Sequence, residues 1–292
     1  MDAEEQGDAA PAPSQPPPAA EASAAAEVAE STAPPVRHWP PPGELSSHAG
    51  RVEAAFLGAL AGERAAQAPA AAGDLLEVAA SIAGVGGFDA EDLRRRGLTG
   101  SSQAGPAGLL LRAVPFGLLS PWDRPRIRRD AYRVAALAGA DEATAVAAVA
   151  AALLAADLTR FDPVTAAVRV RQSLLEDAPM ALLDRLRTGP AELPEHDDDP
   201  GAALQLAVAA MGSADQVEAA VRAATAPGRR AAVSLAGALA GAHLGSAGID
   251  DALRSSLPHG QRAVELAAAV ASVAGGAAGP GSPSEPPAPQ PA

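Results

Sequence analysis

The sequence predicts an all-α protein, a single compact multi-helix domain between two disordered tails. Alanine makes up more than a quarter of the 292 residues, and both alanine and leucine favour helix. Aromatic residues are only 2% of the chain, and isoleucine occurs only at Ile82, Ile127 and Ile249. Because strands favour aromatic and β-branched side chains, we expect no large sheet.

Both ends of the chain have the composition of disordered segments. Residues 1–45 are rich in Pro, Ala, Glu and Ser with a net charge of −7, and the Pro-rich residues 276–292 carry −1. Such segments have too little large apolar surface to offset the entropy of ordering. The first tail lacks the basic start and apolar run of a signal peptide, so we expect a cytoplasmic protein. The predicted domain, residues 46–275, carries the remaining −5 of the total −13.

Apolar spacing and capping residues predict the helices of this domain. In 49–67, Val52, Phe56 and Leu60 recur at helical spacing, and in 72–86 the apolar residues again share one side. Four polar residues precede helical runs as N-caps do: Asp89, Asp141, Ser213 and Asp250. The Pro- and Asp-rich segment 188–201 is expected to be a loop. In order, the expected helices are 49–67, 72–86, 90–96, 109–119, 127–138, 141–157, 163–175, 178–187, 201–211, 214–225, 230–245, 250–257 and 260–274.

Missing residue types exclude several classes of function. Without lysine the chain has no P-loop lysine and no Schiff base, and without cysteine it has no disulfide, thiol nucleophile or cysteine-bound zinc. The bias towards Ala, Gly, Pro and Arg is typical of a GC-rich bacterial genome. The one basic cluster lies within 124–129 of an acidic chain, so we expect no nucleic-acid binding. The apolar stretch 231–249 is mostly Ala and Gly, which favours a buried helix over a membrane span.

Glycines recur every four residues in one predicted helix, at Gly237, Gly241 and Gly245. A second pair, Gly58 and Gly62, lies near the start of the domain. Glycine costs about 1 kcal/mol relative to alanine inside a helix. This spacing therefore predicts a face that another helix or a ligand approaches closely, and tight helix packing is the simpler interpretation.

The glycine-rich segment LAGALAGAHLGSAGI, 235–249, resembles the C-terminal signature of the ADP-ribosylglycohydrolase family, of the dinitrogenase-reductase-activating-glycohydrolase type. Four further segments resemble family blocks in the same order: RVEAAFLGALAGERAAQAP, LLEVAASIAGVGGFDAEDLRRR, GLLLRAVPFGLL and ALAGADEATAVAAVAAALLAAD. The resemblance implies an all-α fold and two Mg²⁺ ions that bind the ADP-ribose diol and a water. The reaction that it implies is cleavage of an N- or O-glycosidic bond to ADP-ribose.

The polar motifs of that family are largely replaced here. Its D-x-D-T motif falls on Gly228-Arg229-Arg230-Ala231, and its TDDT motif falls on Pro69–Ala72, with Ala70 and Ala71 at the aspartate positions. Shifting the second alignment recovers only Asp74, and the opening Gly-Asp becomes Gly62-Glu63. A guanidinium cannot ligate Mg²⁺ and would repel it. The resemblance therefore predicts a member without the binuclear centre, with no metal and no cofactor.

Three hypotheses about function follow. The first is an inactive relative that binds a protein partner or an ADP-ribose-like ligand, whose phosphates would pair with arginines; the candidates are Arg112, Arg229 and Arg230. The second is an active hydrolase with a displaced site, for which the catalytic candidates are Glu63 and Asp74, with the acidic run 195–199. The third is a purely structural interaction module with Pro-rich tails.

Overall fold

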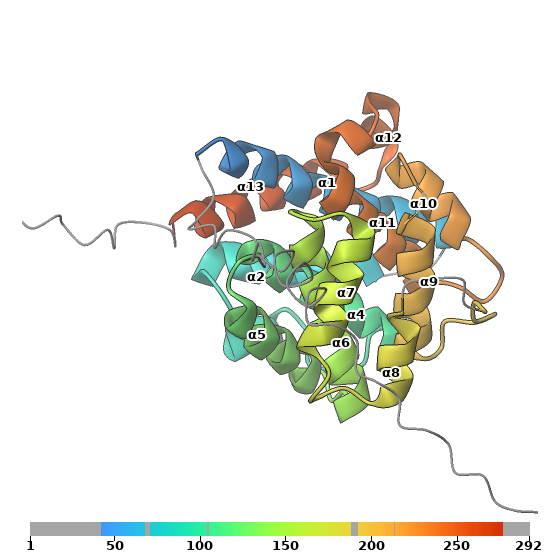
Figure 1. Ribbon diagram of the computed structural model, residues 1–292. Coiled ribbons are helices and arrows are strands. Elements are labelled where there is room, and N and C mark those ends of the chain that lie inside the picture. Colours follow the sequence, from blue (N-terminus) through green and yellow to red (C-terminus); the bar gives the residue numbers. More distant parts are fainter. Residues whose placement is uncertain (1–41, 68–70, 104, 188–191, 213, 277–292) are drawn as a thin grey trace, which may run out of the picture. The chain divides into compact units, whose positions relative to one another are not determined.

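The structure is a computed structural model, and it describes residues 42–67, 71–103, 105–187, 192–212 and 214–276 (Figure 1). Within these ranges all regular structure is helical, with thirteen α-helices, two short 3-10 helices and no strand. The predicted all-α class is confirmed. The two predicted tails lie outside the described residues, apart from 42–45, which already belong to the first helix, and Gly276, which ends the last.

The helices follow the predicted order, and their ends differ from the prediction by at most three residues, except that the first helix begins at Pro42, seven residues earlier than expected. In chain order they are α1 (Pro42–Ala66), α2 (Ala71–Val85), α3 (Ala90–Arg95), η1 (Pro106–Gly108), α4 (Leu109–Leu119), α5 (Arg124–Leu137), α6 (Glu142–Leu158), α7 (Pro163–Ser173), α8 (Met180–Arg185), α9 (Pro200–Gly212), α10 (Val217–Ala224), α11 (Ala231–Leu244), η2 (Gly245–Gly248), α12 (Asp251–Ser256) and α13 (Gly260–Gly276).

Aspartate side chains cap several helix N-termini. The carboxylates of Asp89, Asp141 and Asp250 accept hydrogen bonds from backbone N–H groups of α3, α6 and α12, as the sequence predicts. Asp123 caps α5 in the same way, so this helix begins three residues earlier than expected. Ser213 lies outside the described residues; α10 begins at Val217, three residues later than expected, with Gln216 at the N-cap position.

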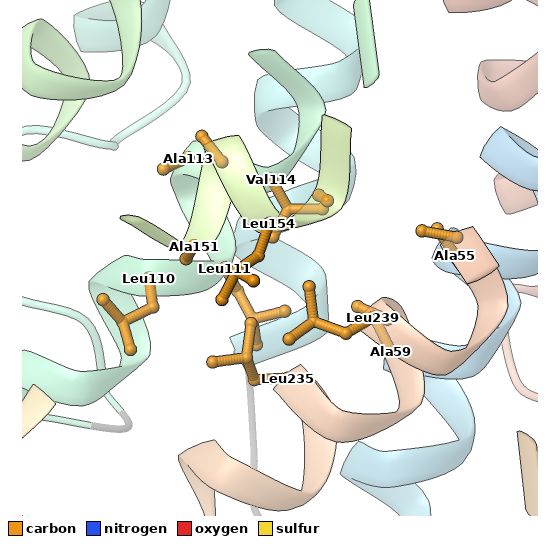
Figure 2. Close-up of a cluster of buried hydrophobic side chains, with 14 of the residues drawn as sticks. Ala55, Ala59, Leu110, Leu111, Ala113, Val114, Ala151, Leu154, Leu235 and Leu239 are labelled. Atoms are coloured by element: carbon orange, nitrogen blue, oxygen red, sulfur yellow. The ribbon is translucent and has the colours of Figure 1, made fainter. Parts of the chain in front are cut away.

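Helix α11 lies at the centre of the hydrophobic core. It contacts α1 on one side and α4, α6, α9 and α10 on others. Figure 2 shows Leu235 and Leu239 of α11 pointing towards the apolar side chains of α4 and α6, with Ala55 and Ala59 of α1 beside the same helix. All these side chains are buried. The core is thus one continuous cluster of alanine, leucine and valine that joins the helices into a single domain.

One stretch, Ala231–Gly248, is long and apolar enough to cross a membrane by length and composition alone. Within the domain, however, 78% of this stretch is buried against other helices. The predicted buried helix is therefore observed, and its apolar character is that of a core element.

Candidate functional site

Glycines bring α1 and α11 into backbone contact. A Cβ atom added to Gly237 would lie 2.0 Å from the carbonyl oxygen of Gly58, and one added to Gly241 would lie 2.1 Å from that of Ala54. Real Cβ atoms do not approach other atoms so closely. The predicted close approach is therefore confirmed, and what approaches is a second helix. Gly245 lies beyond this contact, where a φ of +66° ends α11.

This crossing sets the C-terminal end of α1 beside the first turn of α11. A Cβ added to Gly62 would lie 2.5 Å from the Cα of Ser234. The next residue, Glu63, accepts a hydrogen bond through Oε2 from the backbone N–H of Ala72, at 2.7 Å. The end of α1, the start of α2 and the start of α11 therefore meet. We call this region the polar end; it holds the described residues among the positions that the sequence aligns with the three family motifs.

Glu63 serves as a capping residue for α2 in this arrangement. Its carboxylate satisfies one of the backbone N–H groups that a helix leaves free in its first turn. Ala71 begins α2, and Ala70 lies outside the described residues. The first candidate catalytic carboxylate is thus bonded to the backbone of the neighbouring helix.

Asp74, one turn further along α2, forms an ion pair with Arg112 of α4. The Nε and Nη2 atoms of Arg112 donate to Oδ2 of Asp74, at 3.0 and 2.8 Å. Its Nη1 donates to the backbone carbonyl oxygens of Leu98 and Gly100. The Arg112 side chain is only 3% exposed, so all three nitrogens of this candidate ligand-binding residue are occupied inside the domain.

The start of α11 is covered by a segment far away in the sequence, residues 192–199. The Oδ2 atom of Asp197 accepts from the backbone N–H groups of Arg230 and Ala232, at 2.7 and 2.8 Å. The Arg229 guanidinium donates to backbone carbonyls of the same segment, those of Pro194 and Glu195. Asp197 therefore caps α11 from a position 35 residues before it.

His196 lies over Gly228, just before α11. Gly228 has a φ of +81°, and a Cβ added there would lie 2.5 Å from the His196 Nδ1 atom. An aspartate at this position would therefore meet both backbone strain and a steric clash. The Arg230 side chain, in contrast, is exposed and has no hydrogen-bond or ion-pair partner among the residues that the structure describes.

The role of Asp197 is the feature that sequence reasoning missed. The acidic run 195–199 reads as a solvated turn, and its other members are indeed exposed, but Asp197 is only 5% exposed. The available signal was the start of α11 itself: Gly228-Arg229-Arg230 offers no side-chain oxygen, so the helix needs an acceptor from elsewhere. Across the described ranges, no group of three or more His, Asp or Glu side chains is arranged to hold a metal ion.

Comparisons with known proteins agree with this fold. A sequence model of the ADP-ribosylglycohydrolase family matches residues 25–279. The chain therefore belongs to the ADP-ribosylglycohydrolase family.

Among solved structures, an ADP-ribosylglycohydrolase-related protein complex is similar, with a TM-score of 0.66 and 21% sequence identity. The similarity covers 78% of this chain and 99% of that chain. At this level of identity the likeness shows a common fold. A comparison with curated proteins gives no significant match.

Proposed function

We propose that this chain is a catalytically inactive member of the ADP-ribosylglycohydrolase family. It would use the helical fold to bind a protein partner, or an ADP-ribose-like ligand without a metal. One observation carries the proposal: the carboxylates at the polar end are engaged in hydrogen bonds that hold the fold together. Glu63 bonds to α2, Asp74 to Arg112, and Asp197 to the start of α11.

The residues present do not fit a pair of Mg²⁺ ions. Mg²⁺ is held by carboxylate and other oxygens in near-octahedral geometry. The positions aligned with the aspartates of the D-x-D-T motif carry Gly228 and Arg230 instead. Arg230 would add a positive charge where the ions need negative ones. No step of a metal-assisted hydrolysis can be derived from these side chains.

Arg230 is the group at the polar end that is best placed to contact a ligand. It directly precedes α11 and its guanidinium extends into solvent. Guanidinium groups pair well with phosphate oxygens, so an ADP-ribose-like ligand would contact Arg230 through its diphosphate. The other two candidates, Arg229 and Arg112, donate to backbone carbonyl groups of the domain. They would therefore stabilise the backbone around the site.

Nucleic acid is not part of this proposal, because the arginines of the basic cluster at the start of α5 are engaged in ion pairs. Arg124 pairs with the buried Asp157, and Arg126 and Arg129 both pair with Asp130. A nucleic-acid interface needs arginines that are free to contact phosphates along a stripe.

A hydrolysis assay tests the loss of activity. The protein would be mixed at stoichiometric amounts with an ADP-ribosylated protein, with and without Mg²⁺, and released ADP-ribose would be measured. We expect no release under either condition. Mg²⁺-stimulated release that is lost in Glu63→Gln and Asp74→Asn variants would instead establish an active hydrolase with a displaced site.

A further inference from the structure

Exposed apolar side chains concentrate on the outer side of α7 and the segment that follows it. Among the residues that the structure describes, seven large apolar side chains are exposed, and four of these belong to one short segment: Val164, Val168, Leu175 and Met180. Helix α7 packs against α6 and α9 with its other side, and Figure 1 shows it on the outside of the domain. Isolated exposed apolar residues are normal, but a group on one element marks an interaction surface.

The exposed residues of this segment recur every four positions. Arg160, Val164, Val168, Gln172 and Glu176 are all exposed, and residues four apart share one side of a helix. The three central residues belong to α7, whereas Arg160 lies in the turn before it and Glu176 in the turn after it. We call these five residues the α7 stripe. Its centre is apolar, and its two ends carry opposite charges.

The two charged ends of the α7 stripe have no ion-pair partner in the described part of the chain. The Arg160 guanidinium lies over the Phe161 ring, 5.3 Å from its centroid, and the Glu176 carboxylate is exposed. The other charged residues of the segment 160–177 are bonded within the domain: Asp162 to Thr165, Arg169 to Asp157, Arg171 to the Leu183 carbonyl and Asp177 to Arg128. The segment has three arginines and three carboxylates, so its formal net charge is zero.

The order of residues in the α7 stripe is complementary to itself when it is reversed. Val168 is the central residue, and Arg160 and Glu176 lie eight positions before and after it. When two stripes pack antiparallel about a two-fold axis at Val168, Arg160 of each copy faces Glu176 of the other. A two-fold axis forms every such contact twice. In a parallel arrangement like charges would face each other and repel, so the charges select the antiparallel pair.

We propose that the α7 stripe is the contact surface of a homodimer in which two copies of α7 pack antiparallel. The valines of the two copies meet at the centre, and Leu175 and Met180 extend the apolar contact. The net charge of −13 on each chain opposes association, so the dimer forms and dissociates with concentration. None of the polar-end residues belongs to the stripe, and the dimer is independent of the inactive status proposed above.

Sedimentation velocity of the full-length protein over a series of concentrations tests for the dimer. We expect the sedimentation coefficient to rise from the monomer value towards the dimer value. Val168→Asp places two carboxylates at the two-fold axis and should keep the protein monomeric. The matched control is Val85→Asp, at an exposed valine that ends α2, and it should dimerise like the parent. Equal melting temperatures for the two variants show that any difference in association is not a folding defect.

Charge reversal at the two ends of the stripe tests its antiparallel register. Glu176→Arg gives a stripe with arginine at both ends, and Arg160→Glu gives a stripe with glutamate at both ends. Each variant alone should dimerise about tenfold more weakly than the parent. An equimolar mixture of the two should associate at least as well as the parent, because every end then faces an opposite charge.

Two variants of an exposed ion pair on α3 are the controls for these charge changes. Glu91→Arg and Arg94→Glu change the net charge by the same amounts outside the stripe, and each should dimerise like the parent. The proposal is overturned if the parent stays monomeric at every concentration or if Val168→Asp dimerises like Val85→Asp. It is also overturned if the stripe variants self-associate like the α3 controls, or if their mixture associates no better than each variant alone.

Discussion

The α1–α11 crossing and the polar end are adjacent parts of the same two helices, yet they are built in opposite ways. At the crossing, Gly58 and Gly237 place backbone against backbone. At the polar end, a few residues further along, carboxylates of Glu63 and Asp197 bond to the first turns of α2 and α11. Close packing of small residues stabilises the crossing, and hydrogen bonds stabilise the polar end.

The difference shows that the two regions depend on different features of the sequence. The crossing depends on small residues at fixed positions, since any side chain at Gly237 would push the helices apart. The polar end depends only on acceptors for free N–H groups, and these can come from any nearby segment, as Asp197 does. The segments that resemble the family are accordingly the apolar ones.

The largest expected effect comes from adding a methyl group at the crossing. Gly237→Ala places a Cβ in the space of the Gly58 carbonyl oxygen, and we expect the free energy of unfolding to fall by about 3 kcal/mol. Gly84→Ala in α2 is the matched control, because its Cβ meets nothing within 4 Å; it should stabilise by up to about 1 kcal/mol. Urea unfolding measures both, and equal effects would show that the crossing is not close-packed.

Breaking the ion pair between α2 and α4 should lower the free energy of unfolding nearly as much as the Gly237→Ala substitution does. Asp74→Ala leaves the buried guanidinium of Arg112 without its counter-charge, and we expect a loss of about 3 kcal/mol. The control is Asp184→Ala, which removes an exposed pair with Arg187 and should change stability by less than about 0.5 kcal/mol. If Asp74→Ala left the free energy of unfolding unchanged, the carboxylate would not be needed for the fold. A catalytic role for Asp74 would then have to be considered again.

Removing the distant cap of α11 should have a smaller effect. Asp197→Ala leaves the N–H groups of Arg230 and Ala232 without an acceptor, and we expect a loss of about 1–2 kcal/mol. The control is the exposed neighbour: the free energy of unfolding of Asp198→Ala should stay within about 0.5 kcal/mol of that of the parent. Equal unfolding midpoints for the two variants would contradict the capping role.

A pH dependence arises from His48 of α1, whose Nε2 donates to the Leu118 carbonyl at 2.8 Å. Burial lowers the pKa of His48, the hydrogen bond to Leu118 opposes this, and the charge of Arg51 adds to the lowering. The unfolded chain therefore takes up a proton near pH 6.5 while the native state stays neutral. Stability should fall as the pH drops below about 6.5, and the loss is complete once the pH lies below the native pKa.

The variant His48→Gln isolates this effect, because glutamine can still donate to Leu118 but does not titrate. Its melting temperature should change less than that of the parent between pH 7 and the pH at which carboxylates begin to titrate, about 4.5. His196→Gln, at an exposed position, should retain the pH dependence of the parent. Identical pH profiles for His48→Gln and the parent would assign the effect to other groups.

The sequence predicted the helices well and the contacts between distant segments poorly. Apolar spacing and aspartate caps are local signals, and they placed α4 at its observed bounds and Asp89, Asp141 and Asp250 at helix starts. The glycine spacing also predicted the close approach of a helix, but not that the partner would be Gly58 on α1. The spacing of glycines along one helix predicts which face of that helix packs closely. It does not identify the helix that packs against this face.

At the polar end, the sequence predicted which residues are candidates for a functional role but not what these residues contact. Glu63 and Asp74 were candidates because they are the carboxylates left near the motif positions. Their bonds to Ala72 and Arg112 depend on the tertiary arrangement, and the cap by Asp197 spans 35 residues. No local pattern encodes these contacts.

A calorimetric titration of the full-length protein with ADP-ribose, with and without Mg²⁺, tests the proposed loss of the metal centre most directly. The carboxylates of the polar end are committed to the fold, so any affinity for ADP-ribose should be the same in both titrations and should fall when Arg230→Gln removes the exposed guanidinium. Tight binding that requires Mg²⁺ would contradict the proposal, because it would show that a metal site forms from residues assigned here to structure.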